Sequence, residues 1–320
     1  MLAIVAPGQG AQKPGMLIPW LEVPGLSPLA ATFAEAAGID LPRLGTTAGA
    51  EEIKDTAVTQ PLVVASALLA AAVLPLPQDF ACAGHSVGEL AAAALAGIID
   101  PKTAVRAAGI RGAAMGLACA LAPTSMSAVL GGDSDVVLAA LDALDLVGAN
   151  VNGGGQIVAA GTTDALAALA ADPPAGARII PLPVAGAFHT RYMAPAQQAV
   201  EDFLRGVTAV DPTRPLLTNS DGSVVPTGRA YLDLLSAQVT RPVRWDACMA
   251  MLSRLGVTGV LELPPAGTLV GLVKRDLKGV ATLALKSPDD LDKAAAFIAE
   301  HSTAAPTSTA SPSSPVRSQV

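Results

Sequence analysis

The sequence is poor in cysteine, in aromatic side chains and in charge. It has three cysteines in 320 residues, and its residues are 3% aromatic and 15% charged. Cys82, Cys119 and Cys248 lie far apart with no C-x-x-C spacing, which excludes a disulfide framework and a thiolate zinc site. Hydrophobic residues make up 51% of the chain, too many for a solvated, disordered protein. We therefore expect reduced, buried thiols and a core of alanine, valine and leucine.

Positive charge is scarce as well. The formal net charge is -7 and the isoelectric point is near 4.9. A negatively charged protein has no general attraction to phosphate backbones, so we expect no nucleic acid partner. We also expect no metal ion and no cofactor.

Long hydrophobic runs are missing, although the mean hydropathy is +0.49. The strongest candidate, residues 61–74, is shorter than the ~20 residues that a membrane-spanning helix needs. Pro61 at its start and Pro75 and Pro77 after its end predict a buried helix that begins near Pro61. The N-terminus has no basic segment, and its apolar run breaks at Pro7, too early for a signal peptide. We therefore expect a cytoplasmic protein with no membrane partner.

Short apolar runs bounded by glycine or proline recur along the chain and predict strands. They cover residues 2–6, 80–83, 127–130, 156–160, 178–182, 257–263 and 282–285. Alanine-rich segments between them predict helices at 87–98, 101–117, 136–144, 164–171 and 194–204. Strands that alternate with helices indicate an α/β fold with mostly parallel pairing.

The middle of the chain differs from its flanks. Residues 123–186 have the order strand, helix, strand, helix, strand, which predicts an inserted α+β subdomain. The larger, discontinuous domain then consists of residues 1–122 and 187–301. Residues 302–320 are almost all serine, threonine, alanine and proline, a composition that predicts a disordered tail.

The sharpest local signal is the G-x-S-x-G pentapeptide at residues 84–88, which follows a predicted strand and precedes a predicted helix. This is the context of a nucleophile elbow, in which the serine occupies a strained strand-to-helix turn. Ser86 is then the nucleophile. The amide of the next residue, Val87, points at the developing oxyanion.

A nucleophilic serine needs a base, and the chain has three histidines. His301 lies at the edge of the predicted tail. His85 adjoins Ser86, and consecutive side chains of an extended segment point to opposite faces. His189, in a turn before a predicted helix, is therefore the candidate base.

A third feature is the glycine-rich segment at residues 7–12, directly after the first predicted strand. It lacks the Gly-Lys-Ser/Thr ending of a phosphate loop and a full G-x-G-x-x-G spacing. As a loop at the carboxyl end of a strand, it can bring a second backbone N–H beside Ser86.

These motifs together resemble the malonyl-CoA:acyl carrier protein transacylases. The resemblance is carried by residues 8–12, 84–89, 186–189 and an arginine within 106–112, spread over residues 1 to about 300. It implies an α/β-hydrolase-like large domain with an inserted ferredoxin-like small subdomain. It also implies that malonyl passes from malonyl-CoA to a serine, that coenzyme A leaves, and that the phosphopantetheine thiol of acyl carrier protein takes the malonyl group, for fatty acid or polyketide synthesis.

The resemblance also implies roles for single residues. Ser86 matches the nucleophile and His189 the base, while Gln9 and Val87 match the pair whose amides form the oxyanion hole. Arg111 matches the arginine that binds the malonyl carboxylate, and a guanidinium suits this role because it offers two parallel N–H donors and stays charged when buried. Its neighbour Arg106 is the alternative.

Further positions line the implied pocket. Gln238 matches the residue whose main-chain carbonyl orients the histidine in place of a carboxylate. Gln60, Asn152 and Gln156 match polar pocket positions, although each could equally be a buried core amide. Phe188, an aromatic residue before the histidine, matches the malonyl-selective pattern.

One segment departs from the family. Where its members usually have Gly-Pro-Gly, residues 263–267 read Leu-Pro-Pro-Ala-Gly, so we expect the backbone to turn differently there.

Two other functions remain open. A serine esterase or thioesterase needs an acidic residue between the serine and the histidine. The candidates are Asp133, Asp135, Asp142, Asp145, Asp164 and Asp172. A non-enzymatic module that docks carrier protein needs a basic patch. The candidates are Lys274, Arg275 and Lys278, or Arg241 and Arg244.

Overall fold

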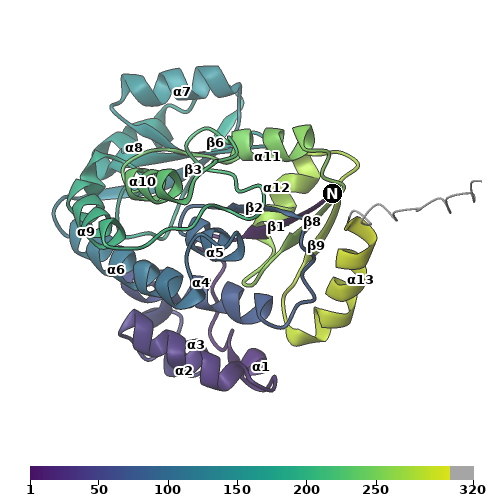
Figure 1. Cartoon of the computed structure of the whole chain (residues 1–320). Coiled ribbons are helices and arrows are strands. Elements are labelled where there is room, and N and C mark those ends of the chain that lie inside the picture. The colour runs from purple at the N-terminus through teal and green to yellow at the C-terminus, as the bar shows by residue number, and fades with distance from the viewer. Residues whose placement is uncertain (303–320) are drawn as a thin grey trace, which may run out of the picture.

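The computed structural model of the chain describes residues 1–302. These residues form two sheets with helices packed around them (Figure 1). The tail expected at residues 302–320 lies, except for its first residue, outside the described part. No helix of residues 1–302 is long and apolar enough to cross a membrane.

A four-stranded parallel sheet forms the centre of the molecule. Its order is β2-β1-β8-β9, with bounds β1 Leu2–Ala6, β2 Ala81–Gly84, β8 Gly259–Glu262 and β9 Ala281–Ala284. Every residue of β1, β2 and β8 is buried, because helices cover both faces of the sheet. Burial on both faces explains why these strands read as continuous apolar runs. The strands predicted here are confirmed to within two residues at each end.

The second sheet has five strands in the order β6-β3-β5-β4-β7. Their bounds are β3 Thr124–Gly131, β4 Val147–Gly153, β5 Gln156–Thr162, β6 Ala177–Pro181 and β7 Val243–Arg244. All pairings are antiparallel except β4 with β7. This sheet is therefore the largely antiparallel part of a fold whose other sheet is parallel, and it is built mainly from neighbouring segments of residues 124–181.

The sequence analysis missed β4 and β7. In β4, glycines and asparagines alternate with apolar residues, and both residue types are depleted in strands. Val243–Arg244 is too short for any periodicity to show. Tertiary pairing with β5 organises β4 in spite of its composition.

The helices complete the layers. Two of them, α7 Ser134–Ala143 and α8 Thr163–Ala171, belong to the chain segment of the five-stranded sheet. The others are α1 Ile18–Leu21, α2 Leu26–Ala37, α3 Leu41–Thr46, α4 Thr56–Ala71, α5 Gly88–Leu95, α6 Pro101–Cys119, α9 Ala194–Arg205, α10 Gly228–Gln238, α11 Trp245–Arg254, α12 Thr268–Asp276 and α13 Leu291–His301. Short 3₁₀ turns lie at Glu52–Lys54, Arg191–Met193 and Pro288–Asp290.

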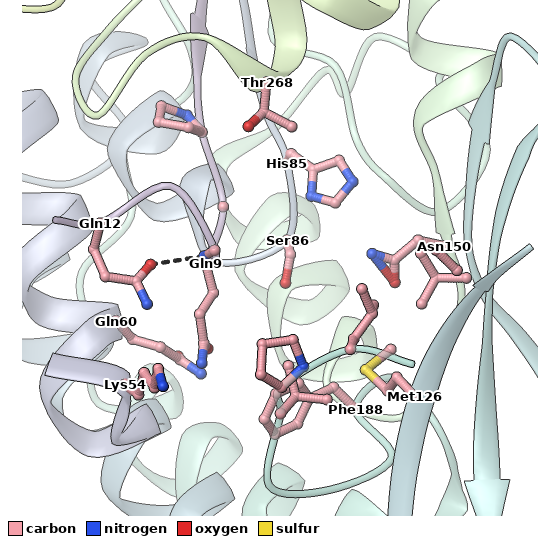
Figure 2. A pocket seen from close by; sticks show the side chains of 18 of the residues that line it. Gln9, Gln12, Lys54, Gln60, His85, Ser86, Met126, Asn150, Phe188 and Thr268 are labelled. Atoms are coloured by element: carbon pink, nitrogen blue, oxygen red, sulfur yellow. Dashed lines mark hydrogen bonds between the residues drawn. The ribbon is translucent and has the colours of Figure 1, made fainter. Parts of the chain in front are cut away.

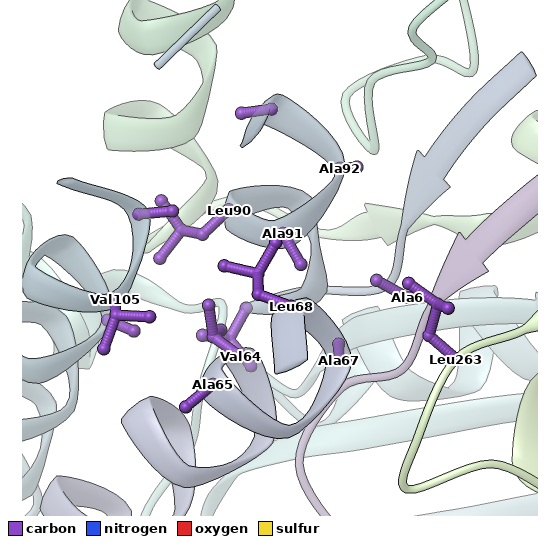
Figure 3. Packing of buried hydrophobic residues seen from close by; sticks show 14 of the residues in the cluster. Ala6, Val64, Ala65, Ala67, Leu68, Leu90, Ala91, Ala92, Val105 and Leu263 are labelled. Atoms are coloured by element: carbon purple, nitrogen blue, oxygen red, sulfur yellow. The ribbon is translucent and has the colours of Figure 1, made fainter. Parts of the chain in front are cut away.

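Helix α4 begins five residues before the predicted start. The side chain of Asp55 accepts a hydrogen bond from the Ala57 amide and caps the helix, so Pro61 lies inside it. The prediction that Pro61 marks the first turn is therefore wrong. The core around α4 consists largely of alanine, valine and leucine, as expected (Figure 3). Small residues such as Ala65 and Ala91 leave the helices room to pack closely.

Candidate active site

Ser86 occupies the turn between β2 and α5. Its φ is 53°, in the left-handed region that residues with a Cβ rarely adopt. The two motif glycines make this turn possible. A Cβ on Gly84 would lie 2.1 Å from the Gly88 carbonyl carbon, and a Cβ on Gly88 would lie 2.3 Å from the Ala6 oxygen.

His189 meets Ser86 from a loop after β6. Its Nε2 lies 2.7 Å from Ser86 Oγ, and its Nδ1 lies 2.8 Å from the main-chain oxygen of Gln238. A carbonyl oxygen can only accept, so Nδ1 carries the proton and donates to it. Nε2 is then free to accept the proton of the Ser86 hydroxyl.

Arg111 reaches the same serine from α6. Its Nη1 donates to Gln60 Oε1 at 2.7 Å, and its Nη2 donates to Gln238 Oε1 at 2.9 Å and to Ser86 Oγ at 3.3 Å. The side chain is buried. Arg106, the alternative, instead stacks over the ring of Phe203 at 5.3 Å. The structure therefore brings Arg111, and not Arg106, to Ser86.

The loop at residues 7–12 lies beside the elbow. The His85 amide donates to the Ala6 oxygen at 3.0 Å, which ties the two turns together. Within residues 1–302, the main-chain amides of Gln9 and Val87 donate to no protein acceptor. Both amides are thus available to an oxyanion. The Gln9 side chain donates through Nε2 to Thr56 Oγ1 at 3.3 Å.

These groups line a cavity of about 430 Å³ between the two sheets. Figure 2 shows Ser86 in its middle, with Gln9 and Gln60 on one side and Asn150 and Met126, from the five-stranded sheet, on the other. The ring of Phe188, the residue before His189, forms part of the wall.

The other two histidines form no hydrogen bond with Ser86 Oγ within residues 1–302. His85 Nε2 lies 2.8 Å from Asn152 Oδ1, and Asn152 donates in turn to Gln156 Oε1 at 3.2 Å. His85 therefore faces β4 and links the elbow to the five-stranded sheet. His301, at the end of α13, lies 3.0 Å from Thr258 Oγ1.

Burial and charge set the protonation of the site. Burial, assisted by the positive charge of Arg111, lowers the pKa of His189 to about 3. Burial also lowers the pKa of Arg111 to about 10, while the charge of Glu89 opposes this shift. At neutral pH the guanidinium is charged and the imidazole is neutral, the form that can accept a proton.

The segment that departs from the family lies near the pocket. The Pro264–Pro265 peptide bond is cis. The buried side chain of Glu262 accepts hydrogen bonds from the amides of Gly267, Leu269 and Val270, so it holds the segment against the start of α12.

Sequence reasoning missed two residues at the site. The side chain of Asn219 accepts a hydrogen bond from the Ser86 amide at 2.7 Å. The side chain of Glu89 accepts one from the Asn219 amide at 2.6 Å. Glu89 could have been found from the sequence, because it is an acidic residue in an otherwise apolar helix directly after the motif. Asn219 lies in a loop and had no such signal.

Comparisons with known proteins agree with this geometry. The model of the acyl transferase domain family matches residues 4–303. The chain belongs to the acyl transferase family. This acyl transferase is 54% identical over 300 residues to a malonyl CoA-acyl carrier protein transacylase of Mycobacterium tuberculosis, with 92% of this chain and 99% of the relative covered. The corresponding protein of Escherichia coli K12 is 34% identical over 299 residues, covering 89% and 96% of the two chains.

Solved structures show the same fold. The acyl transferase superposes on the crystal structure of MCAT from Mycobacterium tuberculosis with a TM-score of 0.89, at 54% identity and with 92% and 99% of the chains covered. A complex described as a type II PKS acyl-carrier protein with its malonyl-transacylase matches with a TM-score of 0.84 at 29% identity, covering 92% of this chain and 99% of that one. The α/β class and the family resemblance are thereby confirmed.

Proposed function

We propose that the chain transfers malonyl from malonyl-CoA to the phosphopantetheine thiol of acyl carrier protein through a malonyl ester of Ser86. One observation carries the proposal. A base, His189, and a buried cation, Arg111, meet at the same serine oxygen, at 2.7 and 3.3 Å. A base beside a serine suits acyl transfer, and a guanidinium beside it suits an acyl group that ends in a carboxylate. The names of the curated relatives support the same reaction.

The first half-reaction forms the ester. Ser86 Oγ attacks the thioester carbonyl carbon while its proton moves to His189 Nε2, and the carbonyl oxygen becomes an oxyanion between the amides of Gln9 and Val87. When the oxyanion collapses, the carbon–sulfur bond breaks. His189 then returns the proton to the leaving thiolate of coenzyme A.

The second half-reaction runs the same steps with a new thiol. The phosphopantetheine thiol gives its proton to His189 and attacks the ester carbonyl carbon. The bond to Ser86 Oγ breaks, and the serine oxygen takes the proton back from His189. Both halves balance as written with coenzyme A, the phosphopantetheine thiol and the side chains of Ser86 and His189.

Selectivity for malonyl follows from the walls of the pocket. A malonyl carboxylate can pair with Arg111, whereas acetyl leaves this buried cation without an anionic partner, which costs free energy. Gln60 holds the guanidinium in place. The ring of Phe188 fills space that an α-methyl group would need, and a methyl-sized difference is worth about 1–3 kcal/mol.

The setting of the reaction belongs to the same proposal. We infer a cytoplasmic enzyme that supplies fatty acid synthesis, and a polyketide carrier protein is a second acceptor suggested by the matching complex. We further propose that residues 1–122 and 187–301 form the catalytic domain and residues 123–186 the small subdomain.

A serine hydrolase is a weaker candidate. It needs a carboxylate to orient His189, but Nδ1 of that histidine faces the Gln238 oxygen. Of the aspartates considered, Asp133 caps α7 and Asp145 pairs with Arg191.

The test is the intact mass of the protein after brief incubation with malonyl-CoA. We expect one malonyl adduct on the native chain, none on Ser86→Ala, and far slower labelling from acetyl-CoA. Release of coenzyme A without an adduct would indicate hydrolysis. Neither adduct nor release would leave the docking module as the better explanation.

A further inference from the structure

A buried carboxylate lies directly behind the catalytic residues. Glu89 is in the first turn of α5, three residues after the nucleophile, and 1% of its surface is exposed. One carboxylate oxygen accepts a hydrogen bond from the main-chain N–H of Asn219 at 2.6 Å, and the other accepts one from the side-chain Nε2 of Gln238. The steps of malonyl transfer do not use this carboxylate.

The two partners of Glu89 hold the backbone of the nucleophile. Asn219 Oδ1 accepts from the Ser86 amide at 2.7 Å, and Gln238 Nε2 donates to the Ser86 carbonyl oxygen at 3.0 Å. Ser86 has a positive φ, and such a conformation persists only where its surroundings impose it. Glu89 accepts hydrogen bonds from the main chain of Asn219 and from the side chain of Gln238, so it holds both of the residues that impose this conformation.

Gln238 also connects Glu89 to the two groups that act on Ser86. Its side-chain oxygen accepts from Arg111 Nη2 at 2.9 Å, and its main-chain oxygen accepts from His189 Nδ1 at 2.8 Å. Arg111 and Glu89 thus lie at opposite ends of one amide group. Because the glutamine intervenes, the guanidinium keeps donors free for a substrate carboxylate, which a direct ion pair with Glu89 would occupy.

The carboxylate of Glu89 can also stabilise the positive charge that builds up at the site during the reaction. When His189 accepts the serine proton, the buried site holds two positive charges, an imidazolium and the guanidinium of Arg111. A negative charge nearby stabilises that state, the role that a carboxylate in contact with the histidine plays in a Ser-His-Asp triad. At this site a carbonyl oxygen occupies that position, and the carboxylate lies one residue further away.

We propose that Glu89 is a positioning residue of the transfer reaction, and that its ionised carboxylate, acting through Gln238 and Asn219, holds Ser86 in its strained turn and balances the charge on His189 during attack. The inference rests on the proposed function. Both carboxylate oxygens face N–H donors, so the geometry accommodates the ionised form.

The groups around Glu89 determine how the proposal appears in a pH profile. Burial raises the pKa of Glu89 to about 8, against the hydrogen bonds from Asn219 and Gln238 and the charge of Arg111. The other titratable groups that interact with it directly are Tyr231 and Cys248, and His189 is linked to it through Gln238. Burial lowers the pKa of His189 to about 3 and raises the pKa values of Tyr231 and Cys248 above their usual range. The rate of acylation should therefore rise with pH as Glu89 ionises.

The first test is Glu89→Gln. An amide has one acceptor oxygen for two N–H donors and carries no charge, so we expect kcat for malonyl transfer to fall about 100-fold. KM for malonyl-CoA should change by less than about threefold, because Glu89 touches no substrate. The rise of the native rate with pH should be lost in the variant. A native kcat, or an unchanged pH profile, would overturn the proposal.

A matched control comes from the second buried glutamate. Glu262 is also fully buried and accepts three main-chain hydrogen bonds, but these hold the start of α12 and not Ser86. We expect Glu262→Gln to lower thermal stability while it keeps the native pH profile. If the acylation rate no longer rises with pH in either variant, then substitution of any buried carboxylate removes this pH dependence, and the proposal would be overturned.

A second variant and a second probe complete the test. If Glu89→Gln does not fold, Asn219→Ala is the alternative, because it removes the side chain that accepts from the Ser86 amide and keeps the Glu89 carboxylate. In this variant kcat should fall, while the rate of acylation should still rise with pH. A native kcat would contradict the proposal. A fluorophosphonate, which bonds to Ser86 Oγ through phosphorus and releases fluoride, reports serine reactivity without any malonyl group. If the native protein reacts with this probe and not with malonyl-CoA, the proposed function fails, and the rates of the variants with the probe still decide the role of Glu89.

Discussion

The two sheets contribute to the site in different ways. The four-stranded sheet is parallel, and β1, β2 and β8 are buried along their whole length. The five-stranded sheet is largely antiparallel, and β4 and β6 are partly exposed. The first sheet ends in the elbow of Ser86, whereas the second supplies walls such as Met126 and Asn152.

This difference shows where the geometry has to be held most tightly. A reacting oxygen must be placed to within a fraction of an ångström, and buried backbone on all sides achieves this. A pocket wall tolerates more movement, so a half-exposed sheet is sufficient. Substitutions in the first sheet should therefore cost more than equivalent substitutions in the second, and the following experiments can break or sharpen this contrast.

The largest contrast should come from adding one methyl group to each sheet. In Gly84→Ala the new Cβ meets the backbone of α5 at 2.1 Å, and we expect the free energy of unfolding to fall by more than about 3 kcal/mol, with loss of Ser86 acylation. In Gly161→Ala, on β5, it meets the end of the Leu146 side chain at 2.5 Å, which can move. A loss of about 1 kcal/mol is expected there. Urea unfolding measures both values, and equal losses would contradict the contrast.

Arg111→Ala should have the next largest effect. Without the guanidinium, a malonyl carboxylate enters a buried site with no cationic partner, so the preference for malonyl over acetyl should fall by about 100-fold, or about 3 kcal/mol. The ratio of acylation rates from the two thioesters measures it. Arg106→Ala, on the same helix, should keep the native ratio, because Arg106 contacts Phe203. An unchanged ratio in Arg111→Ala would remove this account of selectivity.

Asn152→Ala should have a smaller effect. It deletes the acceptor for His85 and so loosens the contact between the elbow and the second sheet. A lost hydrogen bond of this kind is worth about 1 kcal/mol, so kcat/KM should fall about fivefold. Arg178→Ala, an exposed position on β6, is the control and should have native kinetics. A loss in kcat/KM of about 100-fold would show that the second sheet also positions the reacting groups.

The smallest expected effect concerns the protonation state of the His189 imidazole as the pH is lowered. Because burial and Arg111 lower its pKa to about 3, the imidazole should stay neutral, with its proton on Nδ1, down to pH 5. Nitrogen-15 spectra of histidine-labelled protein can follow this, since the chain has three histidines. Arg111→Ala removes a nearby positive charge and should raise the pKa. An imidazolium at pH 6 in the native protein would contradict the expected environment.

The sequence predicted much of this protein because its signals are local. Buried parallel strands read as apolar runs, and the helix predicted at residues 101–117 begins at Pro101 as expected and ends two residues later, at Cys119. Ser86 and His189 were recoverable because a short motif marks one and the scarcity of histidine marks the other. The strand β4 and the start of α4 were missed because pairing with β5 and capping by Asp55 outweighed composition and Pro61.

The amino-acid sequence by itself determined the α/β class, the strand-to-helix turn at Ser86 and the choice of Ser86 as the candidate nucleophile, because each depends on residues close together in the chain. Only the tertiary structure decided which arginine faces Ser86, and that Glu89 and Asn219 stand behind it. Ser86 and Asn219 are 133 positions apart, and the side chains of Arg111 and Gln238 are 127 apart. Contacts over such distances arise from the packing of helices on the sheet, which no local pattern records.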